Sequence, residues 1–206
     1  MSPKGAYHHG RLREALVEAA LEAVAEGGVA SVSMADAARR AGVSPAAPYR
    51  HFAGRQALLL ATAVDTARAL ADRLERAGGG GRRSAPAEAL AACAEAYTLF
   101  YLERGAGLDL VYLAELRTLR DAELAGAGRR VMDCVLPVAR EIAGSADGAI
   151  VLLEQVFAVA HGYAQLRDVS LSSRRLRSPA AVARAAGAAV RLLAAATADP
   201  AVTVGA

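Results

Sequence analysis

Apolar residues recur at three- and four-residue intervals along almost the whole chain, and this spacing limits the possible folds more than any other feature. Alternation of apolar and polar residues, which half-buried strands require, never extends over a useful length. We therefore predict an all-α fold. The expected helices cover residues 11–26, 33–41, 45–52, 55–77, 85–104, 108–122, 128–144, 148–170 and 179–197.

The composition allows a large core: 54% of the residues are hydrophobic and 22% are charged. The longest apolar stretch is broken by Glu154, Gln155 and His161, so no membrane span is predicted. The first residues, "MSPKGAYHHGRLRE", lack the apolar centre of a secretory signal, and we expect a cytoplasmic location.

The two cysteines, Cys93 and Cys134, each lie in an apolar helical pattern, and neither has a second Cys or a His at ligand spacing. We interpret them as small core side chains and predict no metal site and no cofactor. Neither GxSxG nor HExxH occurs, and no paired carboxylates have a partnering base. The protein is therefore not expected to be an enzyme.

The clearest breaks in the helical pattern are glycines and prolines. "GGGGRRS" (78–84) follows a helix, not a strand, and is interpreted as a flexible linker. The last predicted helix has Ser178 as N-cap and Pro179 at its first position. The tail from Pro200 onward is expected to be disordered.

Two short helices are predicted close together near the N-terminus. The first lies in "SMADAARRAG", with Ser33 as N-cap, Asp36 completing a capping box and Gly42 as terminator. The second begins after Gly42-Val43-Ser44. Two short helices joined by a turn that contains glycine form a helix-turn-helix, whose second helix enters the DNA major groove.

The second helix, in "GVSPAAPYRHF", contains two prolines. With Ser44 as N-cap, Pro45 takes the first helical position, where its missing N–H costs nothing. Pro48 takes the fourth position and shares one face with Phe52, so both are expected to pack inward.

The opposite face of this helix carries Ala46, Ala47, Tyr49 and Arg50. The alanines would let the backbone approach base edges, and arginine paired to guanine is the commonest specific contact. Tyr49 and the flanking His51 are placed to meet phosphate oxygens, which set register and not sequence.

Basic residues gather near the N-terminus. Residues 1–55 hold seven Lys/Arg against five Asp/Glu. Arg11 and Arg13 are expected in the first turn of the first helix, and Arg55 begins the fourth. Cations there oppose the helix dipole, and a nearby phosphate would reverse that effect. Solvated surface arginines remain the alternative. Lys4, in the same segment, joins the predicted DNA contacts.

The stretch "SVSMADAARRAGVSPAAPYRHFAGRQALLLA" resembles the DNA-binding segment of the tetracycline-repressor (TetR) family of bacterial transcription regulators, with a match from about Tyr7 to Leu60. "FAVAHGYAQL" (157–166) resembles the His-Gly motif of a subgroup. The resemblance implies an all-α homodimer with a three-helix helix-turn-helix domain at 7–54. The implied domain for effector binding and dimerisation covers 55–200.

The resemblance also implies roles for single residues. Its phosphate contacts would be Ser33, Ser44, Tyr49, His51 and Arg55, and its groove contacts Pro45, Ala46, Ala47 and Arg50. The family dimerises through its last two long helices, here 148–170 and 179–197. This fits the apolar stripe formed by Val182, Ala186, Ala189, Val190 and Leu193.

The implied function is that of a transcriptional regulator, expected to be a repressor that a small-molecule effector releases from a palindromic operator. Candidate effector contacts are the large or polar-tipped residues of the C-terminal helices: Tyr97, Tyr101, Tyr112, Met132, Phe157 and His161. Ordinary core packing would also account for each of them. The alternative function is a helical ligand-binding protein without operator binding.

Overall fold

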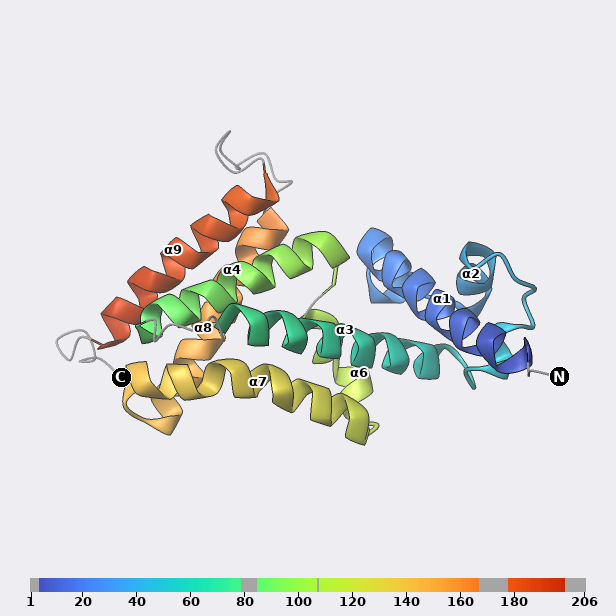
Figure 1. The fold of residues 1–206 in the computed structure, drawn as a ribbon, viewed down its shortest axis with the longest axis horizontal. Helices are drawn as coiled ribbons and strands as arrows, with labels where there is room; N and C mark the ends of the chain where they lie inside the picture. Colours follow the sequence, from blue (N-terminus) through green and yellow to red (C-terminus); the bar gives the residue numbers. More distant parts are fainter. Residues whose placement is uncertain (1–3, 79–84, 107, 167–177, 199–206) are drawn as a thin grey trace. The chain divides into compact units, whose positions relative to one another are not determined.

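The computed structural model describes residues 4–78, 85–106, 108–166 and 178–198, and these residues form helices joined by short turns (Figure 1). Two regions predicted to lack structure, residues 79–84 of the linker and the tail from Pro200, lie outside the described residues. No strand occurs in the described ranges, as the helical spacing predicted.

The chain divides into two compact units, residues 1–68 with 104–127 and residues 69–103 with 128–206. This division differs from the predicted boundary between residues 54 and 55. One reason is that helix α3 (Arg55–Gly78) runs without a break from the first unit into the second. The other is that residues 104–127 belong with the N-terminal segment.

The first unit contains the predicted helix-turn-helix. Its elements are α1 (Lys4–Gly27), the 3-10 turn η1 (Val29–Ser31), α2 (Met34–Arg40), the 3-10 turn η2 (Pro48–Arg50), the first half of α3, α5 (Leu108–Val111), α6 (Ala114–Arg117) and the start of α7 (Ala122–Ala143). Leu16, Leu58, Leu59, Leu110 and Leu116 are completely buried in its core.

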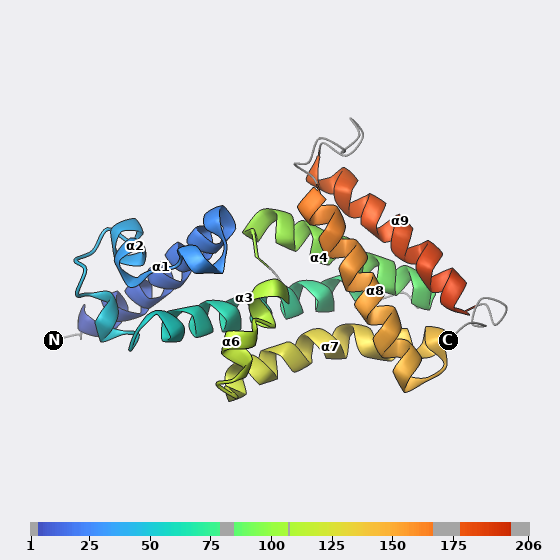
Figure 2. The ribbon, with the colours of Figure 1, turned by 180° about the vertical axis from the view of Figure 1, so that it is seen from behind.

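The second unit consists of the rest of α3, α4 (Pro86–Arg104) without its last residue, the rest of α7, α8 (Ala146–Gln165) and α9 (Pro179–Ala198). Helices α8 and α9 lie side by side in both views (Figure 2). The Ser178 side chain accepts a hydrogen bond from Ala181 N at 3.2 Å, which confirms the predicted N-cap of α9.

Two predicted helix starts were wrong, for the same physical reason. Helix α1 begins at Lys4 and not near residue 11, and α7 begins at Ala122 and not at 128. Glycine disfavours a helix interior by about 1 kcal/mol, so Gly10 and Gly126 lowered the helical signal in each region. Asp121 was a usable signal, because its carboxylate accepts Leu124 N at 2.8 Å and caps α7.

The single helix predicted at 108–122 is broken into α5 and α6, and Arg120 has a positive φ of 51°. Leu110 and Leu116 are both fully buried. On one straight helix they would point about 120° apart, since six residues at 100° each leave that angle. The break lets both side chains reach the same core.

Candidate nucleic-acid interface

The segment predicted as the second helix of the helix-turn-helix is not an α-helix. Residues 45–47 form a turn, and only Pro48–Arg50 are helical, as the 3-10 turn η2. Pro48 has no N–H to give to the Ser44 carbonyl, which instead accepts from Ala47 N at 2.9 Å. Hydrogen bonds between residues three apart then continue, with Arg50 N donating to Ala47 O at 3.2 Å.

The tighter turn keeps the predicted division into two faces. Pro48 and Phe52 are buried, and Phe52 N donates to Pro48 O at 3.0 Å. On the other side Ala46 and Arg50 are exposed, and Tyr49 is 60% exposed. Ala47 is half-buried. The exposed side therefore presents small apolar groups next to a guanidinium and a phenol.

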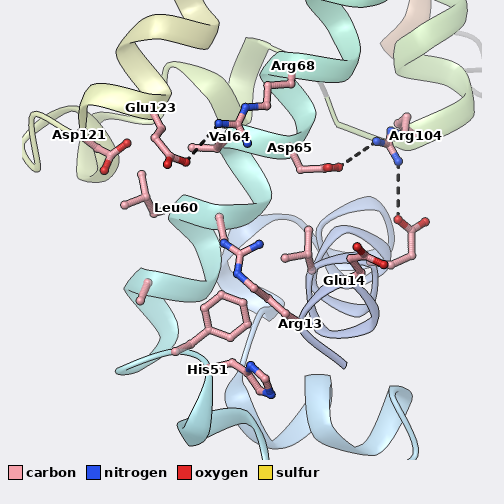
Figure 3. Close-up of a pocket in the computed structure, with 15 residues that line it drawn as sticks. Arg13, Glu14, His51, Leu60, Val64, Asp65, Arg68, Arg104, Asp121 and Glu123 are labelled. Atoms are coloured by element: carbon pink, nitrogen blue, oxygen red, sulfur yellow. Dashed lines mark hydrogen bonds and ion pairs between the residues drawn. The ribbon is translucent and has the colours of Figure 1, made fainter. Parts of the chain in front are cut away.

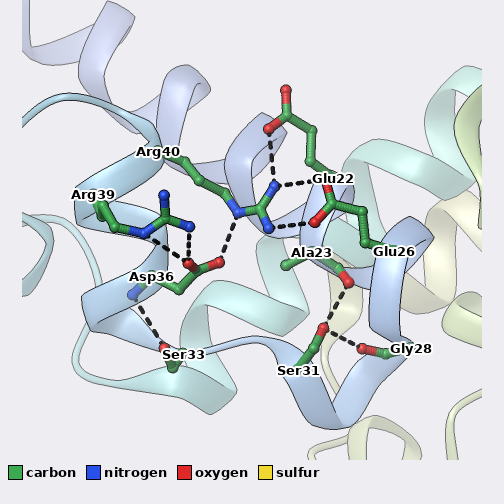
Figure 4. A network of polar contacts seen from close by, with 9 residues as sticks. All are labelled: Glu22, Ala23, Glu26, Gly28, Ser31, Ser33, Asp36, Arg39 and Arg40. Atoms are coloured by element: carbon green, nitrogen blue, oxygen red, sulfur yellow. Dashed lines mark hydrogen bonds and ion pairs between the residues drawn. The ribbon is translucent and has the colours of Figure 1, made fainter.

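Helix α2 is held against α1 by the ion pairs of Arg40 (Figure 4). Its guanidinium contacts Glu26 at 2.5 Å and Glu22 at 3.4 Å on α1, and Asp36 at 2.6 Å on its own helix. These hydrogen bonds hold the pKa values of Glu26 and Asp36 below the ordinary range and raise that of Arg40. The network fixes the helix that precedes η2.

Ser33 caps α2 as predicted, since its hydroxyl oxygen accepts Asp36 N at 3.1 Å. The carboxylate of Asp36 accepts hydrogen bonds from Arg39 and Arg40. In the predicted capping box it would instead accept one from the backbone N–H of Ser33. Gly42 ends the segment with a left-handed φ of 68°, as its position predicted.

Arg55 has contacts that its position at a helix start did not predict. Its guanidinium donates to the Val32 carbonyl at 3.0 Å, to the Val29 carbonyl at 2.9 Å and to Glu115 at 3.0 Å. The side chain thus holds the η1 turn and α6 onto the start of α3. These partners lie far apart in the sequence, so spacing could not reveal them.

The arginines expected in the first turn of α1 lie further along it, because the helix begins at Lys4. Arg11 is exposed. The guanidinium carbon of Arg13 lies 5.4 Å from the centroid of the Phe52 ring, a cation–π distance. The dipole argument therefore does not apply to either residue. The side chain of Lys4 lies outside what the structure describes.

Four of the six candidate effector residues come together in the second unit, on α4 and α8. The Tyr97 hydroxyl lies 2.9 Å from His161 Nδ1, and Gln165 Nε2 donates to the Tyr101 hydroxyl at 2.8 Å. The Tyr97 and Phe157 rings meet edge to face at 5.7 Å. Sequence reasoning missed Gln165, which lies one helical turn after His161.

The other two candidates lie elsewhere. Met132 is half-buried on α7. Tyr112 belongs to the first unit, in the turn between α5 and α6, where it is 43% exposed. Since residues 104–127 pack with the N-terminal part, Tyr112 is not part of the cluster.

Comparison with known families agrees with this geometry. Residues 16–62 match the bacterial regulatory proteins of the tetR family, and residues 90–169 match the tetracyclin repressor-like C-terminal domain. The chain belongs to the tetR family. The first match contains α2, η2 and the start of α3, and the second contains the Tyr97–His161 cluster.

Relatives of known name or structure are similar to parts or most of the chain. The HTH-type transcriptional regulator BetI of Rhizobium meliloti is 46% identical over 50 residues, 24% of this chain and 25% of BetI. A Rhodococcus sp. RHA1 protein of unknown function is 31% identical, with 92% of this chain and 98% of that chain covered and a TM-score of 0.63. PfmR of Thermus thermophilus, a tetR regulator, has the same fold at 18% identity, with 86% and 97% covered and a TM-score of 0.61.

The α9 stripe predicted to meet a second copy is largely inside the chain itself. Val182, Ala186 and Val190 are 0% exposed, so they have no surface left to bury against a partner. Ala189 and Leu193 are half-buried. The prediction failed for the three because α9 packs on α8 within one chain.

By length and composition α9 could also cross a membrane, but core helices of proteins that do not enter a membrane pass that test as well.

A second apolar surface on the same helix pair is exposed. Ile150 and Val151 on α8 are 44% and 52% exposed, and Leu192 on α9 is 74% exposed. Large exposed apolar side chains that form one contiguous patch are typical of a surface that another protein covers.

The cysteines line a cavity of about 300 Å³ in the second unit, between α3, α4 and α7. Cys93 is buried, as predicted, whereas Cys134 is half-buried. Burial raises the pKa of the Cys93 thiol to about 11. Among the described residues, no three His, Cys, Asp or Glu side chains lie close enough to hold a metal ion.

Proposed function

We propose that this protein is a sequence-specific regulator of transcription that reads DNA with the exposed side of the segment from Pro45 to Arg50. One observation carries the proposal: Ala46 and Arg50 are exposed beside Tyr49, while Pro48 and Phe52 anchor the same turn in the core. Alanine methyls suit thymine methyl groups, and a guanidinium suits the guanine edge. The family match over residues 16–62 supports this assignment.

The proposed phosphate contacts surround this segment. They are Lys4, Arg11, Ser33, Ser44, Tyr49 and His51. Arg55 contributes indirectly, because its guanidinium already serves two carbonyls and Glu115. Phosphate contacts set the position of the protein on the duplex without selecting a sequence.

We further propose that the protein acts in the cytoplasm as a homodimer, through the surface of α8 and α9 that carries Ile150, Val151 and Leu192. This surface replaces the buried Val182 stripe as the candidate interface and retains Ala189 and Leu193 at its margin. A two-fold dimer places two DNA-reading segments on half-sites about 34–36 Å apart, which requires a palindromic operator.

The second unit is proposed to bind a small-molecule effector that releases the operator. The cluster of Tyr97, Tyr101, Phe157 and His161 supports this role, because hydroxyl and imidazole groups next to aromatic rings can fix the orientation of a partly apolar ligand. Effector and operator affinities must then change each other by the same factor.

The DNA proposal is tested by selecting bound fragments from the source genome and then titrating the selected operator at 50 and 200 mM salt. Affinity should fall steeply with salt, as phosphate neutralisation requires. Replacement of Arg50 by Ala should lower the preference at one base pair by about 1–3 kcal/mol. The matched control is Arg129→Ala, which removes the same charge from an exposed position on α7.

Two outcomes contradict the proposal. Unchanged base preference in Arg50→Ala would exclude Arg50 as the base-reading residue. Absence of any fragment bound above background at 50 mM salt would favour the alternative, a ligand-binding protein without operator binding.

A further inference from the structure

The first unit contains a cavity of about 500 Å³ beside the DNA-reading segment (Figure 3). Side chains from α1, α3, the residues after η2 and the start of α7 line it. The volume falls within the range of small-molecule sites, about 300–1,000 Å³. Every lining residue belongs to the first unit, so the cavity is separate from the Tyr97–His161 cluster.

Part of the cavity wall is apolar. Val17, Phe52 and Val64 are nearly buried, and Leu60 and Ala61 are half-buried along α3. Together these side chains form an apolar surface, mainly on α1 and α3, that the apolar body of a ligand could contact. Apolar walls with a few charged groups are the usual composition of a small-molecule site.

The rim of the cavity has more negative than positive groups. Its carboxylates are Glu14, Glu18, Asp65, Asp121 and Glu123, and its guanidiniums are Arg13, Arg68 and Arg104. Five carboxylates against three guanidiniums leave an excess of two negative charges.

The ion pairs within the rim show where this excess lies. Arg104 contacts Asp65 at 3.1 Å and Glu18 at 3.6 Å, and Arg68 contacts Glu123 at 3.3 Å. Glu14 and Asp121 form no ion pair with any residue that the structure describes. The Asp121 carboxylate does accept a hydrogen bond from the backbone N–H of Leu124.

Arg13, the third guanidinium of the rim, already contacts another side chain. Arg13 stacks over Phe52, where the ring face attracts its positive charge. The two carboxylates therefore remain for a ligand.

We propose that this cavity binds an organic cation with an apolar body, such as an aryl-alkyl ammonium. The ammonium would pair with Glu14 or with Asp121, which line opposite sides of the cavity (Figure 3), and the apolar body would cover Leu60, Ala61 and Val64. The site goes beyond the effector site proposed for the second unit. Because Phe52 and His51 line the cavity and directly follow η2, its ligand contacts the segment that orients the DNA-reading side.

The sign of the ligand charge is tested with three probes of one shape: 4-phenylbutylamine, which is a cation at neutral pH, 4-phenylbutan-1-ol and 4-phenylbutyrate. Isothermal titration uses the full chain without DNA. We expect the amine to bind roughly 2- to 5-fold more tightly than the alcohol, the gain of one exposed charge pair. We expect the carboxylate to bind most weakly. Equal affinities, or no binding of any probe, overturn the proposal.

Variants test whether the probes bind in this cavity. Glu14→Gln combined with Asp121→Asn should abolish the preference for the amine while the asparagine oxygen still caps α7. The control removes two matched charges elsewhere, Glu141→Gln with Asp147→Asn, and should keep the preference. Ala61→Phe should weaken all three probes by filling the cavity. An unaffected amine affinity in Ala61→Phe, with the thermal midpoint preserved, would place binding elsewhere and refute the proposal.

These measurements do not depend on the proposed DNA-binding function. If the chain binds no operator but prefers the amine, the regulator proposal fails and the cation site stands. If operator binding is intact and the three probes are equivalent, only the cation site fails.

Discussion

Gly105 gives the sharpest test of how the first unit is packed. It joins the end of α4 to the core of the first unit with a left-handed φ of 68°. A Cβ atom built on it would lie 2.2 Å from the Cβ of Ala25 and 2.8 Å from its Cα. Neither neighbour can move away by rotating a side chain, because one is a methyl group and the other is backbone.

Two costs add in the Gly105→Ala variant. A left-handed conformation costs a non-glycine residue about 1–2 kcal/mol. Overpacking against α1 costs about 1–3 kcal/mol more. We expect the free energy of unfolding to fall by about 2–5 kcal/mol, measured by urea titration with circular dichroism.

The matched control is Gly144→Ala. Gly144 also has a φ of 68°, but no atom lies within 4 Å of its Cβ position. It should therefore show only the conformational cost, about 1–2 kcal/mol. Adding Ala25→Gly to Gly105→Ala should recover part of the stability by removing the closest atom. Equal losses in the two single variants would refute the packing argument.

Three further outcomes are expected. Tyr97→Phe should destabilise the protein by about 1 kcal/mol in thermal unfolding, since it removes the buried hydroxyl that contacts His161. Cys134 should react with a thiol reagent well before Cys93, whose raised pKa of about 11 leaves about one thiol in a thousand ionised at pH 8. Two carboxyl partners of Arg40, Asp36 and Glu26, have folded pKa values below their ordinary 3.8 and 4.5. The stabilisation from these two groups is therefore present above those values and is lost as the pH falls through the folded ones. Between pH 6 and pH 3 the free energy of unfolding should therefore fall less in Arg40→Met than in the wild type.

The sequence predicted the helices that begin or end with local signals. The Ser33 and Ser178 caps lie where they were expected, and α3 covers the range predicted for it apart from one residue. These signals act between residues three or four apart, so the sequence alone contains them.

The predictions that failed concern contacts between residues far apart in the sequence, or geometry that the spacing of apolar residues does not specify. The three carbonyl and carboxylate contacts of Arg55 reach residues 23 to 60 positions away. One apolar stripe of α9 was identified, but the spacing could not tell whether it packs on α8 or on a second copy of the chain. The type of helix at η2 depends on the single missing N–H of Pro48, and the spacing of apolar residues does not specify its effect on the turn.

In a 3-10 turn, residues three apart lie directly above one another, unlike in an α-helix. Ala47 and Arg50, joined by the 3.2 Å bond from Arg50 N to Ala47 O, are such a pair. If Arg50 contacts bases as proposed, the bulk of residue 47 limits how closely the arginine side chain can approach them. Altered operator preference in related regulators with this turn should arise as readily from enlarging residue 47 as from replacing the arginine itself.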